Sequence, residues 1–334
     1  MRIALIGGCG FIGHNLAMEL TEYGHTVQII DNLMWNNLVS HSMGPQSFET
    51  SLNKRFFNQR FDILHELGVV FENVDARDEN GLWNALDRTK PDHIVHLSAI
   101  SSAVSAKAVP GLAFDLQMVT LKNTLEYSRS NGTPITFMSS STVYGDFKTP
   151  TVDEASPVNP KGIYAVGKVA GEALVRTYND QYGIDTNIIR PSALYGERCV
   201  SRRVSQMFIE NALLGKPLIL EGGGDGKLDF TYIDDLVVGI RLAIEKTHGT
   251  STYNLTFGNA RTILDLANIV KQVVPDVTLE ERPRAELKPV RGTLSTERAE
   301  SQLGFKAKWP LEKGYLKYCQ WYKEQFDAQL RDAK

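Results

Sequence analysis

The stretch RIALIGGCGFIG, residues 2–13, decides the fold of this chain. A short apolar run leads directly into three glycines, Gly7, Gly10 and Gly13, and a helical pattern follows through Leu20. A strand, a glycine turn and a helix in this order form the context of a dinucleotide fingerprint, whereas the glycines alone would indicate only a turn. Gly7 permits the tight turn, Gly10 lets a pyrophosphate approach the backbone, and Gly13 allows the helix to lie close to the strand.

The predicted cofactor site extends along the start of this helix and the end of the second strand. Free amide groups at Phe11 and Ile12 would face the phosphates. The second strand, residues 26–30, is followed by Asp31 and Asn32. A carboxylate there can accept hydrogen bonds from ribose hydroxyls and would repel a 2′-phosphate. Because no Arg or Lys follows within several positions, NAD is preferred over NADP; the alternative is an Asp that merely caps a loop.

The third and fourth predicted strands, residues 69–74 and 94–97, end in small or polar residues. An adenine could lie beside the first of these ends, and the small side chains after the second leave space for a nicotinamide ribose. The connection before the third strand, residues 33–68, is long for a unit of this kind and contains a predicted helix over 54–67. The cofactor contacts predicted in this part of the chain are Asp75, Ala76, Leu97, Ser98 and Ala99.

A tyrosine and a lysine stand four residues apart, at Tyr164 and Lys168, in a segment that reads as helix over 160–182. This spacing places both side chains on one helical face. A phenol ordinarily has a pKa near 10, and a neighbouring ammonium could make it a base near neutral pH. Four consecutive hydroxyl residues, 139–142, follow the predicted fifth strand, 135–138, where ligands bind such sheets. The alternatives are an ordinary exposed helix and a polar turn.

The composition of the chain limits the classes of molecule that it can be expected to bind. With 334 residues, 42% hydrophobic and 22% charged, the chain has the composition of an ordinary globular protein. A net charge of -3 offers no global attraction to nucleic acid or to an anionic membrane surface. The three cysteines lie far apart and form no metal-binding motif, so we expect reduced thiols and no metal site. The first strand begins at Arg2 and no long apolar run follows, so we expect neither a signal peptide nor a membrane span, and a cytoplasmic protein.

These motifs together resemble the extended short-chain dehydrogenase/reductase family, and within it the nucleotide-sugar epimerases of the UDP-glucose 4-epimerase type. In the first half, the resemblance rests on the glycine loop, Asp31, Asp75, the hydroxyl run that ends in Val-Tyr-Gly, and the Tyr164–Lys168 pair. Further motifs that resemble the family are Arg190-Pro191, Tyr195-Gly196, residues 215–218, 222–226 and 229–235, Arg291 and residues 295–303.

The resemblance implies an α/β fold with a doubly wound parallel (Rossmann) sheet and a smaller carboxyl-terminal substrate-binding domain. Residues 1–190 would form the NAD-binding domain. Residues 191–334 would form mainly the domain for a nucleoside diphosphate sugar, with a segment near 233–256 returning to the first domain. The family also implies a tightly held NAD and a homodimer paired through helices of the first domain.

Carried onto this chain, the family pattern implies roles for individual residues. Tyr164 would remove the proton from the sugar 4-hydroxyl, Lys168 would hold the nicotinamide ribose and lower the pKa of the tyrosine, and Ser140 would bind the same sugar oxygen. Hydride would pass from C4 to the nicotinamide and return to the other face of a 4-keto sugar. The substrate contacts implied are Ser101, Ser140, Ser141, Thr142, Tyr164, Ala193, Arg203 and Arg291.

Two positions favour epimerisation over related reactions. Dehydratases of the family carry Asp-Glu at the positions of Ser141 and Thr142, and decarboxylases keep the Glu at the second. Neutral hydroxyls replace these groups poorly, so C4 epimerisation is the main hypothesis. The alternatives are another NAD-dependent nucleotide-sugar modification, such as an oxidoreductase, dehydratase or more complex reaction, and a non-catalytic NAD-binding regulator.

Three departures from the family pattern affect the predicted substrate site. Leu228 stands where a phosphate-binding arginine is common, Ala193 stands where an asparagine is usual, and Gln117 replaces another asparagine. Other cations must then neutralise the substrate diphosphate. The candidates are Arg198, Arg202 and Arg203, which could instead form a solvated face or bind the carboxylate of a uronic acid sugar.

Overall fold

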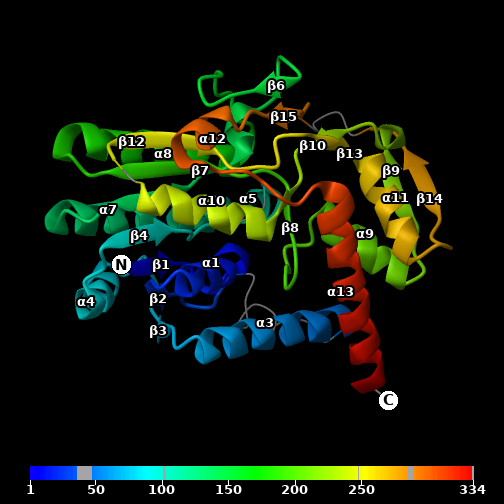
Figure 1. The fold of residues 1–334 in the computed structure, drawn as a ribbon, viewed down its shortest axis with the longest axis horizontal. Helices are drawn as coiled ribbons and strands as arrows, with labels where there is room; N and C mark the ends of the chain where they lie inside the picture. The colour runs from blue at the N-terminus through cyan, green and yellow to red at the C-terminus, as the bar shows by residue number, and fades with distance from the viewer. Residues whose placement is uncertain (36–46, 101–102, 247, 285–288, 333–334) are drawn as a thin grey trace.

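A seven-stranded parallel sheet forms the centre of the protein (Figure 1). The structure is a computed structural model that describes residues 1–35, 47–100, 103–246, 248–284 and 289–332. The strand order is β12-β7-β5-β4-β1-β2-β3, and every neighbouring pair runs parallel. This order confirms the predicted doubly wound fold. The strands are β1 (Arg2–Ile6), β2 (Thr26–Ile30), β3 (Val70–Glu72), β4 (His93–His96), β5 (Ile135–Met138), β7 (Thr186–Arg190) and β12 (Thr250–Asn254).

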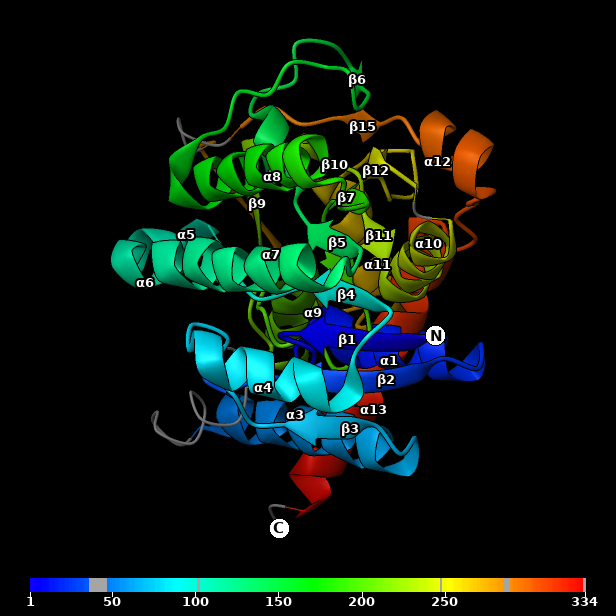
Figure 2. The same ribbon diagram turned by 90° about the vertical axis from the view of Figure 1, so that its left-hand side faces the viewer.

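Helices cover both faces of the sheet, as Figure 2 shows when the sheet is viewed from its side. Because successive strand residues point to opposite faces, Ile3 and Leu5 of β1 pack on one side while Ala4 and Ile6 pack on the other. The first face carries α1 (Phe11–Glu22), α3 (Phe48–Glu66) and α10 (Ile233–Glu245), and the second carries α4 (Glu79–Thr89), α7 (Thr120–Asn131) and α8 (Gly162–Tyr182). Both faces of the sheet are therefore buried, which explains its continuous apolar strands.

Most predicted elements are present, and their ends differ by a few residues. The predicted strands over 69–74 and 94–97 are β3 and β4, and the first is shorter than expected. The helix predicted over 54–67 is the longer α3, and α8 begins at Gly162, two residues after Pro160. The segment from Pro110 to Asn131 is not one continuous α-helix, because a π-helical turn, η1 (Asp115–Val119), separates α6 (Pro110–Phe114) from α7. α5 (Ala103–Ala108) precedes α6.

The second half of the chain lies largely beyond the carboxyl ends of the central strands, at the right of Figure 1. Its parallel pair β9 (Leu218–Glu221) and β14 (Leu279–Arg282) packs with α9 (Val204–Leu213) and α11 (Ile263–Val273). Shorter elements link this region to the sheet: η2 (Ser141–Tyr144), β6 (Thr151–Val152), β8 (Leu194–Tyr195), η3 (Gly222–Gly224), β10 (Lys227–Leu228), β11 (Thr231–Tyr232), β13 (Arg261–Thr262), β15 (Thr293–Leu294) and α12 (Glu297–Leu303).

The last helix, α13 (Leu311–Asp332), crosses α3 and packs against its aromatic side. The ring of Phe56 lies 4.9 Å from that of Trp321 and 5.5 Å from that of Tyr322, measured between centroids. Phe48 and Phe326 form a further edge-to-face pair at 4.8 Å. The long connection between β2 and β3 therefore includes a helix held by the carboxyl-terminal end of the chain.

No helix within the described ranges combines the length and the apolar character that a membrane crossing needs.

Candidate active site

The glycine loop between β1 and α1 has the close backbone contacts that its sequence predicts. Gly7 adopts a φ of +80°, and a Cβ there would lie 2.9 Å from the Ser98 amide nitrogen. A Cβ on Gly13 would lie 2.3 Å from the carbonyl oxygen of Gly8, so any larger residue would push α1 away from the loop. No side chain caps the amino terminus of α1 at Gly10. The first amides of α1 therefore point toward the adjoining cavity, where a phosphate can accept their hydrogen bonds.

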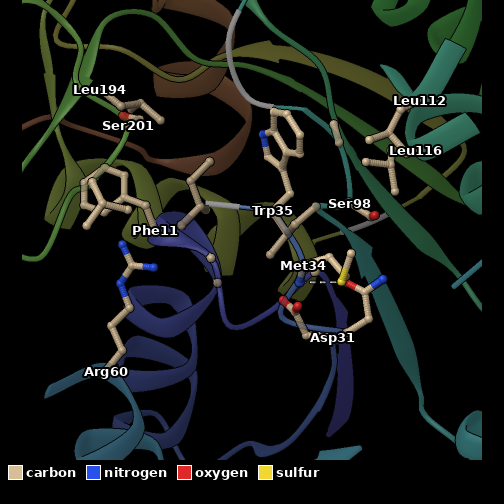
Figure 3. Close-up of a pocket in the computed structure, with 18 of the residues that line it drawn as sticks. Phe11, Asp31, Met34, Trp35, Arg60, Ser98, Leu112, Leu116, Leu194 and Ser201 are labelled. Carbon is tan, nitrogen blue, oxygen red and sulfur yellow. Dashed lines mark hydrogen bonds between the residues drawn. The ribbon is translucent and has the colours of Figure 1, made fainter. Parts of the chain in front are cut away.

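A cavity of about 350 Å³ lies over this loop (Figure 3). Ten predicted cofactor contacts line it: Gly7, Gly10, Phe11, Ile12, Gly13, Asp31, Asn32, Leu97, Ser98 and Ala99. The remaining lining residues are Met34, Trp35, Arg60, Arg77, Leu112, Leu116, Leu194, Val200, Ser201 and Arg203. Apolar walls with amide donors at one end fit a dinucleotide, which presents flat rings and a diphosphate.

Asp31 is held at the end of β2 by backbone amides. Its carboxylate accepts hydrogen bonds from the amides of Cys9 at 3.0 Å and Leu33 at 2.8 Å. Burial raises the pKa of Asp31, while these two amides and the charge of Arg60 oppose the increase. Asp31 is thus fixed on the cavity wall where the sequence predicts a contact with ribose hydroxyls.

Asp75 and Ala76 follow β3, and neither of them lines the first cavity. The neighbouring Arg77 lines it. Asp75 forms an ion pair with Arg77 at 2.6 Å and accepts a hydrogen bond from Asn32 at 3.0 Å. The carbonyl of Ala76 accepts a hydrogen bond from Asn123 Nδ2 at 3.0 Å. Asp75 therefore positions Asn32 and Arg77 beside the cavity.

Tyr164 and Lys168 share one face of α8, as predicted. Tyr164 packs among the apolar residues around Ile100 and Leu116, with the Ser140 side chain beside its hydroxyl. The predicted lowering of its pKa is wrong in direction: burial raises the pKa of Tyr164, and the Arg203 charge and the Ser140 side chain only partly oppose this. The spacing of Tyr164 and Lys168 does not reveal how deeply the phenol is buried.

Lys168 is buried with its ammonium directed toward the sheet. Its Nζ donates to the carbonyl oxygen of Met138 at 2.6 Å and lies 5.8 Å from the centroid of the Tyr164 ring. Burial lowers the pKa of Lys168 to about 8, although the nearby Glu172 carboxylate raises it. The ammonium therefore retains its charge at neutral pH and lies beside the tyrosine.

A buried carboxylate one turn further along α8 supports this lysine. Glu172 accepts hydrogen bonds from Ser139 Oγ at 2.6 Å and from the Arg190 guanidinium at 2.8 and 2.6 Å. Burial raises the pKa of Glu172, but the hydrogen bonds and charge of Arg190 outweigh that effect and lower it overall. The sequence does not single out Glu172, although its spacing from Lys168 is the same as that of Lys168 from Tyr164.

The hydroxyl run after β5 turns into η2 beside Tyr164. Ser140 Oγ accepts a hydrogen bond from the Thr142 amide at 3.2 Å, which fixes the serine at the start of this turn. The carbonyl oxygen of Ser141 accepts a hydrogen bond from Arg291 Nη1 at 2.7 Å. The Thr142 hydroxyl is buried and has no hydrogen-bond partner among the described residues. Ser101, another predicted substrate contact, lies outside the described residues.

A second cavity, of about 570 Å³, lies among β9, β10 and the segment that precedes β15. Arg291 is on its wall, and burial lowers the pKa of this arginine to about 10. Ala193 has a φ of 39°, and its carbonyl oxygen accepts a hydrogen bond from the Thr231 amide at 3.4 Å. It does not line either of these two cavities. The other lining residues are Val204, Ile219, Glu221, Asp225, Gly226, Lys227, Leu228, Ile263, Arg284, Pro289 and Val290.

The three candidate arginines of the 198–203 loop have different environments. Arg203 lines the first cavity, and its charge acts on Tyr164. Arg202 turns toward Glu210, at 3.3 Å, and Glu49, at 3.9 Å. Arg198 donates to His14 and Asn15 on α1. Of the three, Arg203 therefore has the position expected of a ligand-binding cation.

Comparison with known proteins agrees with this geometry. Residues 3–256 match the NAD dependent epimerase/dehydratase family. The chain is 28% identical over 328 residues to a putative UDP-glucose 4-epimerase of Methanocaldococcus jannaschii, covering 96% of this chain and 98% of the relative. It is 26% identical over 341 residues to UDP-glucuronic acid decarboxylase 1 of Danio rerio, covering 99% and 75%. The relatives thus include proteins named for different reactions.

A solved structure shows the same fold. The crystal structure of a UDP-glucose 4-epimerase with UDP-glucose, from Thermotoga maritima, aligns with a TM-score of 0.84 and 24% identity, covering 97% of this chain and 99% of that one. The family match spans more than half of the chain, including the glycine loop, Tyr164 and Lys168. The protein therefore belongs to the NAD-dependent epimerase/dehydratase family, and its cofactor is NAD.

Proposed function

We propose that this protein epimerises C4 of a nucleoside diphosphate sugar through a transient 4-keto intermediate. The observation that carries the proposal is the packing of η2, with the neutral side chains of Ser141 and Thr142, against the helix that carries Tyr164 and Lys168. Such an arrangement provides for removing and returning the proton of one sugar hydroxyl. Ser141 and Thr142 supply no carboxylate for the further acid–base steps of a dehydration.

The proposed roles follow from the contacts of each side chain. Tyr164 accepts the proton of the sugar 4-hydroxyl, and Ser140 orients that oxygen by hydrogen bonding. Lys168, whose ammonium lies 5.8 Å from the centroid of the Tyr164 ring, would hold the nicotinamide ribose, and the charge of Arg203 favours the phenolate. The glycine loop and Asp31 would hold NAD, which would supply hydride acceptance and hydride return at C4 of the sugar. Arg203 and Arg291 lie on the walls of the two cavities, where they can bind the diphosphate.

Proton NMR of the purified protein with a panel of UDP-, GDP- and dTDP-sugars, without added cofactor, tests the proposal. We expect the anomeric and C4 signals of one sugar to change to those of its C4 epimer. UDP-glucose, UDP-N-acetylglucosamine and UDP-glucuronate belong in the panel. A product that has lost water or carbon dioxide, or that remains a ketone, would show that the inference from Ser141 and Thr142 is wrong.

We also propose that the protein is a homodimer paired through α5, α6 and α8. Val104, Phe114, Ile163 and Val166 are apolar and 46–81% exposed on these adjacent helices. Apolar side chains gathered on one face favour association with a second copy. We expect Phe114→Glu to convert a dimer into a monomer in sedimentation velocity, whereas Val70→Glu, at an exposed position on the edge strand β3, leaves it unchanged. A monomeric parent protein would refute the proposal.

A further inference from the structure

A buried guanidinium reaches the cofactor cavity from α3. The side chain of Arg60 lines the cavity together with Gly10 and Phe11, although the residue is only 1% exposed. Figure 3 shows its guanidinium directed toward the start of α1, below Phe11. Arg60 also occupies the apolar stripe of its helix, after Phe56 and Phe57 and before Leu64. A cation in such a stripe requires a partner, because burying an unpaired charge is costly.

Among the described residues, the acceptors of this guanidinium are neutral. Nη1 donates to the carbonyl oxygen of Cys9 at 3.3 Å, and Nη2 donates to the carbonyl oxygen of Arg198. Nε is buried and has no hydrogen-bond partner in the described part of the chain, where no carboxylate forms an ion pair with Arg60 either. Two backbone carbonyls position the group without neutralising it.

Two cations, Arg60 and Arg198, lie near the Asp31 carboxylate, and Glu197 and Asp234 act on Arg198 from its other side. The guanidinium of Arg198 lies nearby, and its Nε donates to His14 Nε2 at 3.1 Å. Burial, together with the charges of Arg60 and Arg198, keeps the pKa of His14 well below its ordinary value, so this imidazole is neutral and adds no charge. Asp31 is the nearby carboxylate, and its oxygens already accept the Cys9 and Leu33 amides. An anion in the cavity would give Arg60 a counter-charge.

We propose that Arg60 binds the pyrophosphate of NAD, opposite the amides at the start of α1, so that α3 forms part of the cofactor site. Nε is available to a ligand because it has no partner within the described ranges, and the anion is the one expected at the glycine loop. This inference rests on the NAD dependence of the family and is independent of the reaction proposed for the sugar.

A purely structural role for Arg60 makes a different prediction. If Arg60 only ties α3 to the carbonyls of Cys9 and Arg198, replacing it would weaken every cofactor fragment to a similar degree. If it binds the pyrophosphate, the loss is confined to ligands that carry the diphosphate. ADP-ribose contains this group and adenosine lacks it, so the ratio of their dissociation constants distinguishes the two roles.

The first measurement is the amount of NAD that co-purifies with the full-length chain, followed by calorimetric titration of the NAD-free protein. We expect Arg60→Met to carry less NAD and to bind ADP-ribose about 10- to 100-fold more weakly, as for the loss of a hydrogen-bonded charge. Adenosine affinity should change by less than about threefold. The dissociation constants of ADP-ribose and adenosine are both measured on the folded fraction alone. Should Arg60→Met fail to fold, Arg60→Gln keeps a donor for the Cys9 carbonyl and tests the same ratio.

Arg55→Met is the matched control, because Arg55 lies on the same helix but forms an ion pair with Asp332 at 2.7 Å. This variant should retain the NAD content and both affinities of the parent. An equal loss of ADP-ribose and adenosine binding in the Arg60 variants would overturn the proposal, as would unchanged ADP-ribose binding. Because no sugar is present, neither outcome depends on whether the protein is an epimerase.

Discussion

Tyr164→Phe is expected to lower turnover of the nucleotide sugar by about 10²- to 10⁴-fold while NAD remains bound. The phenylalanine ring preserves the packing around Ile100 and Leu116, so the shape of the cavity should change little. The substitution removes the phenol oxygen, which lies beside the Ser140 side chain and would take the substrate proton. Steady-state kinetics with the sugar identified by NMR, and NAD released by denaturation, measure the two quantities separately.

The exposed tyrosine at the end of the same helix provides a control for this substitution. Tyr182 is 50% exposed and lies beside Tyr178, away from Ser140. Tyr182→Phe should leave both turnover and cofactor content unchanged. If Tyr164→Phe retains full turnover, the tyrosine is not the base, and if it loses NAD, its main role is to hold the cofactor.

Glu172→Gln is expected to destabilise the protein by about 3–5 kcal/mol, because it leaves the buried Arg190 guanidinium without its counter-charge. The side chains of Glu172 and Arg190 are 5% and 3% exposed, so water cannot replace the lost partner. The substitution also removes the carboxylate that raises the pKa of Lys168, so this pKa should fall below about 8. Urea denaturation measures the free energy of unfolding.

An exposed ion pair shows how much of this effect depends on burial. Glu312 pairs with Arg261 at 2.8 Å, with the glutamate side chain 54% exposed. Glu312→Gln should cost less than about 1 kcal/mol, because surface pairs contribute little. Equal losses of unfolding free energy in the two variants would contradict the importance assigned to the buried pair.

The sequence predicts the fold and the cofactor loop well because their determinants are local. The run from Arg2 to Gly13 specifies strand, turn and helix within one short stretch, and the close contact at Gly13 explains why a glycine is needed there. Asp31 and residues 97–99 follow buried strands, and parallel strands bring their carboxyl ends to one edge. The sequence thus predicted ten residues that line the first cavity.

The parts of the site that the sequence did not predict depend on distant contacts. Arg60 reaches the cavity because α3 packs against α13, and nothing near it in sequence indicates that packing. The sequence signal that could have indicated Arg60 is a charged residue within the apolar stripe of a helix. Arg202 and Arg203 are neighbours in sequence, yet Glu210 holds one while the other lines the cavity. The pKa of Tyr164 likewise depends on burial, which residue spacing does not encode.

The contact between α3 and α13 also sets an order of events during synthesis. Ribosomes add about 5–20 residues per second, so roughly 10–50 s separate the completion of α3 at Glu66 from the appearance of Leu311. Throughout this interval Phe56 lacks the rings of Trp321 and Tyr322, which cover it in the finished protein. The aromatic side of α3 therefore gains its α13 partner only at the end of synthesis, whereas its contacts with α1 can form as soon as α3 has been made.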